Sequence, residues 1–122
     1  MMSNAKIGSA SSVAMSDFEI PREQILEGNP VAKIWINAQS ADKTVTQGVW
    51  ECTAGRFTWE HEGDDFVMLL EGEAVVTEEN GEVHTLRAGD FGFFPNGMKT
   101  TWQVDQFLKK TFTLRTAEPL VL

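Results

Sequence analysis

Apolar and polar residues alternate along most of the chain, in short stretches separated by turn signals. Residues 31–36, 44–52 and 56–61 each alternate, whereas residues 65–72 are apolar at successive positions. Alternation with a period of two is the pattern of a β-strand with one buried face. Residues 65–72 are therefore expected to form a strand that is covered on both faces.

The second half of the chain continues this pattern. Residues 73–90 place Asn80-Gly81 between two alternating stretches, which is the strongest short-range signal of a β-hairpin. Further strands are expected at residues 91–95, 100–104 and 107–115. About eight short strands with a turn roughly every 8 to 12 residues favour an all-β fold, an antiparallel β-barrel or jelly roll that is closed rather than open.

The first part of the chain lacks this alternation. Residues 1–16 are rich in Ser, Ala and Gly and are expected to form a flexible N-terminal tail, of a kind that can dock on a neighbouring subunit. One helical turn is expected around Arg22–Leu26, ended by Gly28 and Pro30. Residues 17–122 are expected to form a single domain.

Composition and charge limit the classes of partner. The chain has 122 residues, and 18 acidic against 10 basic side chains give a formal net charge of −8. Nucleic acids and anionic membranes attract clustered Lys and Arg, so we expect the chain to bind neither nucleic acid nor membrane. We find no apolar run of the roughly 20 residues that cross a bilayer, and none that would form a signal-peptide core.

Cys52 is the single cysteine of the chain, which excludes an intramolecular disulfide and a metal cluster held by cysteines alone. With no targeting signal recognised, the cytoplasm is the expected location. A nucleophilic role for Cys52 would require a lowered thiol pKa, for which its neighbours give no indication. A buried strand cysteine is the favoured interpretation.

Two strands are expected to present aromatic and polar residues to the interior. Alternate residues of a small β-barrel face inward. Trp59 and His61 share the more apolar face of one strand, and Thr100 and Trp102 share that of another. An apolar interior with a few polar groups is how small-molecule sites are built. The predicted pocket residues are Trp59, His61, Asp65, Thr100, Trp102 and Lys110.

Each of these residues also has a purely structural interpretation. Trp59 and Trp102 either stack on a planar ligand or fill the interior. His61 is a metal ligand or proton-transfer group, or only a pocket histidine hydrogen-bonded to Asp65. Lys110 reaches a ligand carboxylate or extends its ammonium group to the rim, and the second interpretation is favoured.

The segment from Gly48 to Leu114 contains four phrases, GVWECTAGRFTWEH, DDFVMLLEGEAVVT, AGDFGFFPNGMKTTWQV and FLKKTF. In these phrases the chain resembles the cupin superfamily, and within it the small single-domain branch similar to the cupin domain of (S)-ureidoglycine aminohydrolase. A cupin of ethanolamine utilisation is a second analogue in the same branch. The resemblance implies a jelly roll that forms a homodimer by strand exchange and sheet packing.

The first cupin motif, G-x5-H-x-H-x3,4-E-x6-G, aligns with this chain when its last glycine is placed on Gly72. Asp65 then stands at the glutamate position and His61 at the second histidine position. Trp59 stands at the first histidine position and Thr53 at the opening glycine. By this resemblance, one ligand is retained and one is shortened.

The second cupin motif, G-x5-P-x-G-x2-H-x3-N, fits without gaps on Gly89, Pro95 and Gly97. Its histidine position is Thr100 and its asparagine position is Val104. A stable transition-metal site needs three or four N, O or S donors, and this alignment supplies two, His61 and Asp65. No tightly bound cofactor is therefore expected, and the alternative is a weakly held divalent Mn, Fe, Ni or Zn ion at His61 and Asp65.

The predicted function is that of a small cupin that binds an organic metabolite, a ureido or amino-carboxylate compound, in its interior beside a degraded metal site. The alternative is a non-catalytic dimeric module whose interior is filled by side chains. Whether the chain is an enzyme stays open. If it is one, the resemblance implies a hydrolase acting on C–N bonds.

Overall fold

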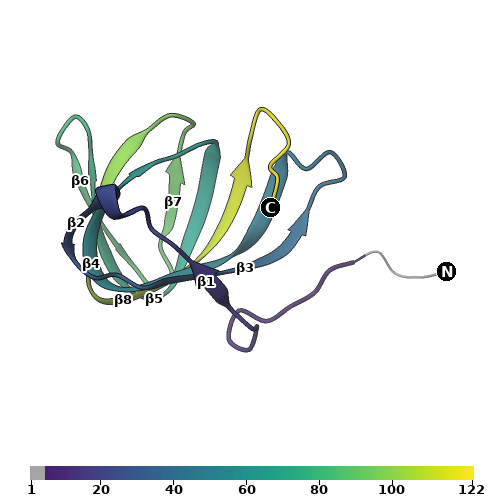
Figure 1. Cartoon of the computed structure of the whole chain (residues 1–122), viewed down its shortest axis with the longest axis horizontal. Helices are drawn as coiled ribbons and strands as arrows, with labels where there is room; N and C mark the ends of the chain where they lie inside the picture. Colours follow the sequence, from purple (N-terminus) through teal and green to yellow (C-terminus); the bar gives the residue numbers. More distant parts are fainter. Residues whose placement is uncertain (1–4) are drawn as a thin grey trace.

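The computed structural model describes residues 5–122 as one antiparallel β-sheet that bends around a concave interior, with no α-helix in these residues (Figure 1). The predicted all-β jelly roll is confirmed. Within the described residues there is no helix with the length and apolar character of a membrane span. The elements are β1 (Ser16–Phe18), the 3-10 helix η1 (Arg22–Gln24), β2 (Ile25–Gly28), β3 (Ala32–Gln39), β4 (Val45–Glu60), β5 (Asp64–Glu78), β6 (Val83–Arg87), β7 (Phe91–Phe94) and β8 (Lys99–Arg115).

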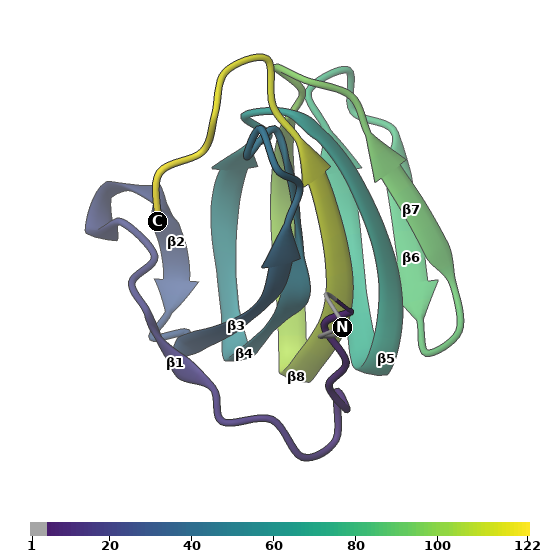
Figure 2. The ribbon, with the colours of Figure 1, turned by 90° about the vertical axis from the view of Figure 1, so that its right-hand side faces the viewer.

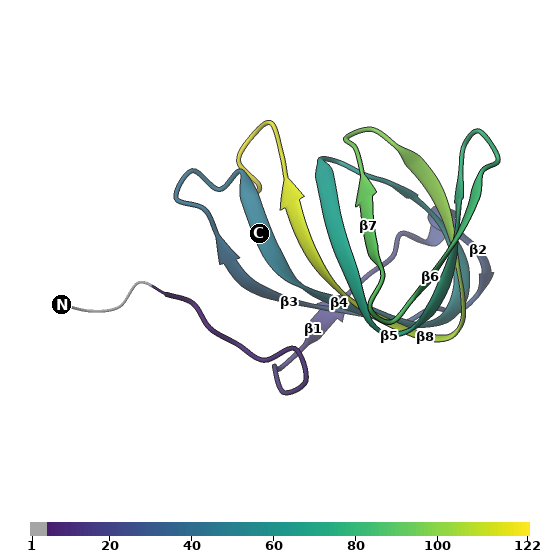
Figure 3. The same cartoon turned by 180° about the vertical axis from the view of Figure 1, so that it is seen from behind.

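Three long strands of 16, 15 and 17 residues, β4, β5 and β8, form the middle of the sheet. β8 lies between β4 and β5 and is antiparallel to both. The other edge of β4 pairs with β3 and, farther along, with β2. The other edge of β5 pairs with β7 and β6 (Figure 3). Each long strand therefore passes through both halves of the jelly roll.

A turn signal inside β4 is a bulge rather than a turn. The sequence predicted a break at Ala54-Gly55, but β4 continues through it and its pairing with β8 shifts register between Thr53 and Gly55. One residue of β4 lies there opposite two residues of β8, and the inward-facing positions of β4 change parity across this point. Cys52 and Phe57, an odd number of residues apart, are consequently both buried. Residues 100–104 and 107–115 were expected to be separate strands, which is wrong. They belong to the single strand β8, which continues through the same irregularity between Val104 and Phe107.

The hydrogen-bonded sheet is not closed, which corrects the expectation of a closed barrel. Its order is β1-β3-β4-β8-β5-β6, and within residues 5–122 no ladder joins the edge strands β1 and β6. These edge strands have only three and five residues. Figure 2 shows the strands curling around one interior, with the C-terminal segment at its rim.

The predicted hairpin at Asn80-Gly81 is confirmed. β5 and β6 pair on either side of it, and Gly81 has a φ of +92° and donates its backbone N–H to the carbonyl of Glu78. The predicted helical turn is the shorter helix η1.

The described part of the N-terminal tail contacts β3. The side-chain amide of Asn37 donates to the carbonyl of Lys6 at 3.3 Å, and Gly8 packs against the indole of Trp35. For residues 1–4, the prediction of a flexible tail lies outside the described residues.

We expect Gly72→Ala to be strongly destabilising. The φ of Gly72 is +80°, and a Cβ at this position would collide with the carbonyl oxygen of Phe107 in the adjacent strand β8. The left-handed backbone alone costs a non-glycine residue about 1 to 2 kcal/mol, and the collision adds to it, so the free energy of unfolding should fall by at least ~3 kcal/mol in urea denaturation.

Gly89→Ala is the matched control for this variant. Its φ is +93°, but no atom lies within 4 Å of the added Cβ. It should therefore cost only the backbone term of about 1 kcal/mol. Equal losses for the two variants would show that the close approach of β5 to β8 is unimportant.

Candidate functional site

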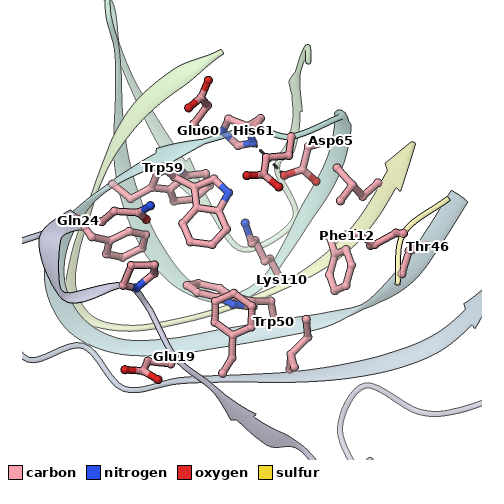
Figure 4. A pocket seen from close by; sticks show the side chains of 18 of the residues that line it. Glu19, Gln24, Thr46, Trp50, Trp59, Glu60, His61, Asp65, Lys110 and Phe112 are labelled. Carbon is pink, nitrogen blue, oxygen red and sulfur yellow. Dashed lines mark hydrogen bonds and ion pairs between the residues drawn. The ribbon is translucent and has the colours of Figure 1, made fainter. Parts of the chain in front are cut away.

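The concave interior holds a cavity of about 460 Å³, within the size range of small-molecule sites (Figure 4). Aromatic rings from β1, β4 and β8 form much of its wall. Five of the six predicted pocket residues line it, and the sixth, Thr100, lies behind His61. The aromatic wall residues are Phe18, Trp50, Phe57, Trp59, Trp102 and Phe112.

His61 is fixed by contacts to both of its ring nitrogens. The residue is 1% exposed, and its ring stacks on Phe94 with a centroid distance of 4.6 Å. Nδ1 lies 3.0 Å from Oδ2 of Asp65, and Nε2 lies 3.1 Å from the hydroxyl of Thr100. His61 follows β4 directly, and its backbone N–H donates to the carbonyl of Met98 just before β8.

The hydrogen bonds of Thr100 define where the protons of His61 lie. The Thr100 hydroxyl donates to the carbonyl of Trp59 at 3.2 Å and accepts from Nε1–H of Trp102 at 2.9 Å. A hydroxyl has one donor and two acceptor sites, so its remaining site accepts from Nε2–H of His61. The contact between Nδ1 of His61 and Oδ2 of Asp65 is then a hydrogen bond with a shared proton, and it lies beside the cavity.

Lys110 has its ammonium group inside the cavity, which corrects the expectation that it extends to the rim. Its Nζ lies 4.4 Å from the ring centroid of Trp102 and 5.1 Å from that of Trp50. Burial lowers the pKa of Lys110, and the charge of Asp65 opposes this shift. The two indole faces attract a cation, which is the physical reason why it remains inside.

Several polar atoms of residues that line the cavity lack hydrogen-bond partners, and one of them is Oε1 of Gln24. Among residues 5–122, no oxygen accepts a hydrogen bond from Nζ of Lys110, and Oδ1 of Asp65 is buried with no donor. A buried polar atom without a partner is costly, and native proteins rarely contain one without a reason. The cavity therefore contains an unengaged hydrogen-bond donor, Nζ of Lys110, and an unengaged acceptor, Oδ1 of Asp65.

A comparison with family models decides the family of this chain. Residues 39–112 match the EutQ-like cupin domain. The chain belongs to the EutQ-like cupins. No curated protein matches it.

Solved structures share the fold of this EutQ-like cupin. A putative ethanolamine utilization protein Q from Salmonella typhimurium LT2 is 24% identical with a TM-score of 0.64, over 72% of each chain. A DUF861 family protein from Thermotoga maritima is 30% identical with a TM-score of 0.53, over 54% of this chain and 75% of that one. A DUF861 protein from Pseudomonas syringae pv. tomato is 20% identical with a TM-score of 0.77, over 84% of this chain but only 44% of that chain. The likeness to ureidoglycine aminohydrolase stays a prediction.

The metal-motif positions of this EutQ-like cupin offer few free donor atoms. Both ring nitrogens of His61 are engaged by Asp65 and Thr100, and the hydroxyl of Thr100 is itself engaged three times. Trp59 contributes no metal-binding atom. Oδ1 of Asp65 is the one unengaged atom among these four side chains that could bind a metal ion.

A second group of donor atoms, which the sequence analysis did not single out, lies on the β5–β6 hairpin. The ligand atoms of Glu78, Glu82 and His84 lie within 4.8 Å of one another. His84 is exposed, and its hydrogen bond to Glu78 at 2.6 Å raises its pKa. The spacing of these residues is visible in the sequence, but their proximity depends on the hairpin register, which pairs Val76 with His84.

Trp50 is the main cavity residue that the sequence analysis missed. Counting alternate positions back from His61 assigns Trp50 to the outer face, whereas the bulge after Thr53 returns it to the interior. Cys52 lies on the same inner face, and burial raises its thiol pKa to about 12. The interpretation of Cys52 as a buried strand cysteine is confirmed.

Lys110→Met is expected to raise the free energy of unfolding at pH 7 by about 1 to 3 kcal/mol, because it replaces a buried amine with an apolar side chain of similar length. In the folded state the pKa of Lys110 lies below its ordinary value of 10.5. At a pH between the folded-state pKa and 10.5, the unfolded chain therefore binds more protons than the folded chain. The wild type therefore gains stability as the pH rises through this window. The advantage of the variant should narrow as the pH approaches 10.5, measured by urea denaturation at several pH values.

Lys33→Met serves as the control, because Lys33 is exposed on β3. Its effect on stability should be small and should not change across the same pH range. A Lys110→Met variant that is less stable than the wild type at pH 7 would show that the indoles more than compensate for burial of the ammonium group.

Proposed function

We propose that this EutQ-like cupin binds a small amino-carboxylate or ureido-carboxylate compound in its interior, without a tightly held metal ion. The observation that carries the proposal is the pairing of an unengaged donor, Lys110 Nζ, with an unengaged buried acceptor, Asp65 Oδ1, in one cavity. A ligand with an anionic group and an N–H donor would engage both.

The ammonium group of Lys110 suits a carboxylate. It carries three N–H donors, and hydrogen bonds between ions are about twice as strong as those between neutral groups. Removal of water from the aromatic wall around Trp50 and Trp102 strengthens this attraction further. The carboxylate of a bound compound would also provide the counter-charge that Lys110 otherwise receives only from Asp65.

The acidic residues of the cavity favour an amino or ureido group at the other end of the ligand. Oδ1 of Asp65 would accept from such a group inside the cavity. Exposed carboxylates of Glu19, Glu60 and Glu62 also line it, and Figure 4 shows Glu19 and Glu60 at its periphery. Their negative charge opposes the entry of polyanions such as nucleotides.

The proposal excludes a tight metal site for reasons of donor chemistry. A transition metal needs three or four donors, and His61 would have to give up a hydrogen bond to supply one. Hydrolysis of a C–N bond stays a prediction from the resemblance to ureidoglycine aminohydrolase. A side-chain-filled module is the less favoured alternative, because the interior has room for a ligand.

Ligand binding is expected to raise the melting temperature. We would screen glycine, N-carbamoylglycine and ureidoglycolate against the protein purified without an affinity tag. A ligand at a hundredfold excess over its Kd should add about 2.7 kcal/mol of stability. Lys110→Met and Asp65→Asn should lose most of this gain, and the exposed-residue variant Lys33→Met should keep it.

Elemental analysis of the same preparation separates the two parts of the proposal. We expect far less than one transition-metal ion per chain. Stoichiometric metal that disappears in His61→Ala would contradict the metal-free site. Failure of every compound in the screen to stabilise the wild type would remove the support for a ligand of this class.

We also propose that the chain forms a homodimer through the outer face of β5 and β7. Phe66 and Phe93 are paired across these strands with a centroid distance of 4.8 Å, yet each is about half exposed. Phe91 beside them is 80% exposed. A second copy is the proposed occupant, because three clustered, exposed phenylalanines are rare on a monomer and mark an interface.

Phe91→Glu is expected to shift the protein from dimer to monomer in light scattering coupled to size-exclusion chromatography, because it places a charge in the proposed apolar interface. Val31→Glu changes another exposed apolar residue, 52% exposed and just before β3, and should leave the dimer intact. A wild-type monomer at high concentration would refute this proposal.

A further inference from the structure

We propose that Lys110 is a nucleophile that forms a Schiff base with a small aldehyde or 2-oxo acid in the cavity. This covalent activity goes beyond reversible binding of an amino-carboxylate. It shares with the proposed function the side chain of Lys110 and the requirement that small molecules enter the cavity.

The position of Lys110 suits a reaction at its nitrogen. The residue is 9% exposed, and Figure 4 shows its Nζ pointing into the cavity rather than toward the outside. In the part of the chain that the structure describes, no oxygen holds this nitrogen. The rings beside it, those of Trp50 and Trp102, offer no oxygen or nitrogen acceptor. The lone pair of the amine form is therefore free to attack a carbonyl carbon.

The surroundings of Lys110 also favour its neutral amine form. Burial lowers the pKa of Lys110, which increases the fraction of the amine that is nucleophilic. Asp65 opposes this effect, but its carboxylate shares a proton with His61 at 3.0 Å. Binding of a carboxylate uses the ammonium form of Lys110, and the covalent reaction uses the amine form of the same group.

The reaction balances with groups that lie at the cavity. The lone pair of Nζ forms a C–N bond to the carbonyl carbon, and the carbonyl π electrons move to oxygen, which takes up a proton. The nitrogen then loses a proton, and a second proton on the hydroxyl group lets it leave as water as the C=N bond forms. The shared proton of His61 and Asp65, beside the unengaged Oδ1, is suited to this exchange.

The same surroundings limit the carbonyl compound. The cavity volume of about 460 Å³ and its aromatic wall admit a small, compact molecule. Lys110 and His61 are the only basic side chains that line it among the described residues, and acidic side chains outnumber them. A neutral aldehyde or a 2-oxo acid fits, because the carboxylate of the latter lies beside the new iminium charge.

Reductive trapping tests the inference. The protein would be incubated separately with propanal and with pyruvate, in the presence of cyanoborohydride, and modified lysines would be located by peptide mass spectrometry. We expect Lys110 to be alkylated several-fold faster than the exposed Lys33 and Lys99, because its lowered pKa increases the fraction present as the amine. The Lys110→Met variant should lose the fast alkylation and keep the slow alkylation of the exposed lysines.

Asp65→Asn tests the proton exchange. It should slow the alkylation of Lys110 several-fold at a pH where the amine form already predominates. It should also move the pH profile to lower pH, because the charge of Asp65 no longer favours the ammonium form, while the profile of Lys33 stays the same. The near-ultraviolet circular dichroism of each variant would confirm that its aromatic core is folded.

The outcomes separate this inference from the proposed function. Alkylation of Lys110 no faster than that of Lys33 overturns the Schiff base, even if N-carbamoylglycine raises the melting temperature. Fast alkylation of Lys110 supports it, even if none of the amino-carboxylates binds. Fast alkylation that persists unchanged in Asp65→Asn overturns the assigned role of Asp65.

Discussion

The bulge in β4 is the constraint on which the rest of the interior depends. A strand of 16 residues that kept strict alternation would turn either Trp50 or Phe57 outward. The register shift between Thr53 and Gly55, where one residue of β4 lies opposite two of β8, places both inside, and their rings lie 6.1 Å apart. This shift brings Trp50 next to Lys110, its partner in register on β8, and so creates the aromatic surroundings of the amine.

The chemistry of the cavity depends on which of its polar groups already have hydrogen-bond partners within the protein. His61 has partners on both ring nitrogens, and Thr100 uses all of its hydrogen-bonding capacity. Lys110 and one oxygen of Asp65 are left for other molecules. Buried polar groups of folded proteins usually pair with one another, and these two unpaired groups are the basis on which we propose a ligand site.

Much of the fold was accessible from the sequence because alternation and turn residues are local signals. The hairpin at Asn80-Gly81 and the inward face of Trp102 follow from them directly. The continuous course of β4 was not accessible, because Ala54-Gly55 is equally consistent with a turn and a bulge. The same ambiguity concealed Trp50, and the location of the Lys110 ammonium group depends on that indole.

The open edge of the sheet has a consequence for the breadth of compounds that the interior accommodates. In a closed barrel, strand number and stagger fix the internal diameter. Here the side facing β1 is bounded by ring packing, with Phe18 lying 6.0 Å from Trp50 and 5.9 Å from Trp59. On this side the width of the interior is therefore set by side-chain rotamers, and a change in the rotamer of Phe18 would alter it without breaking a strand-to-strand ladder.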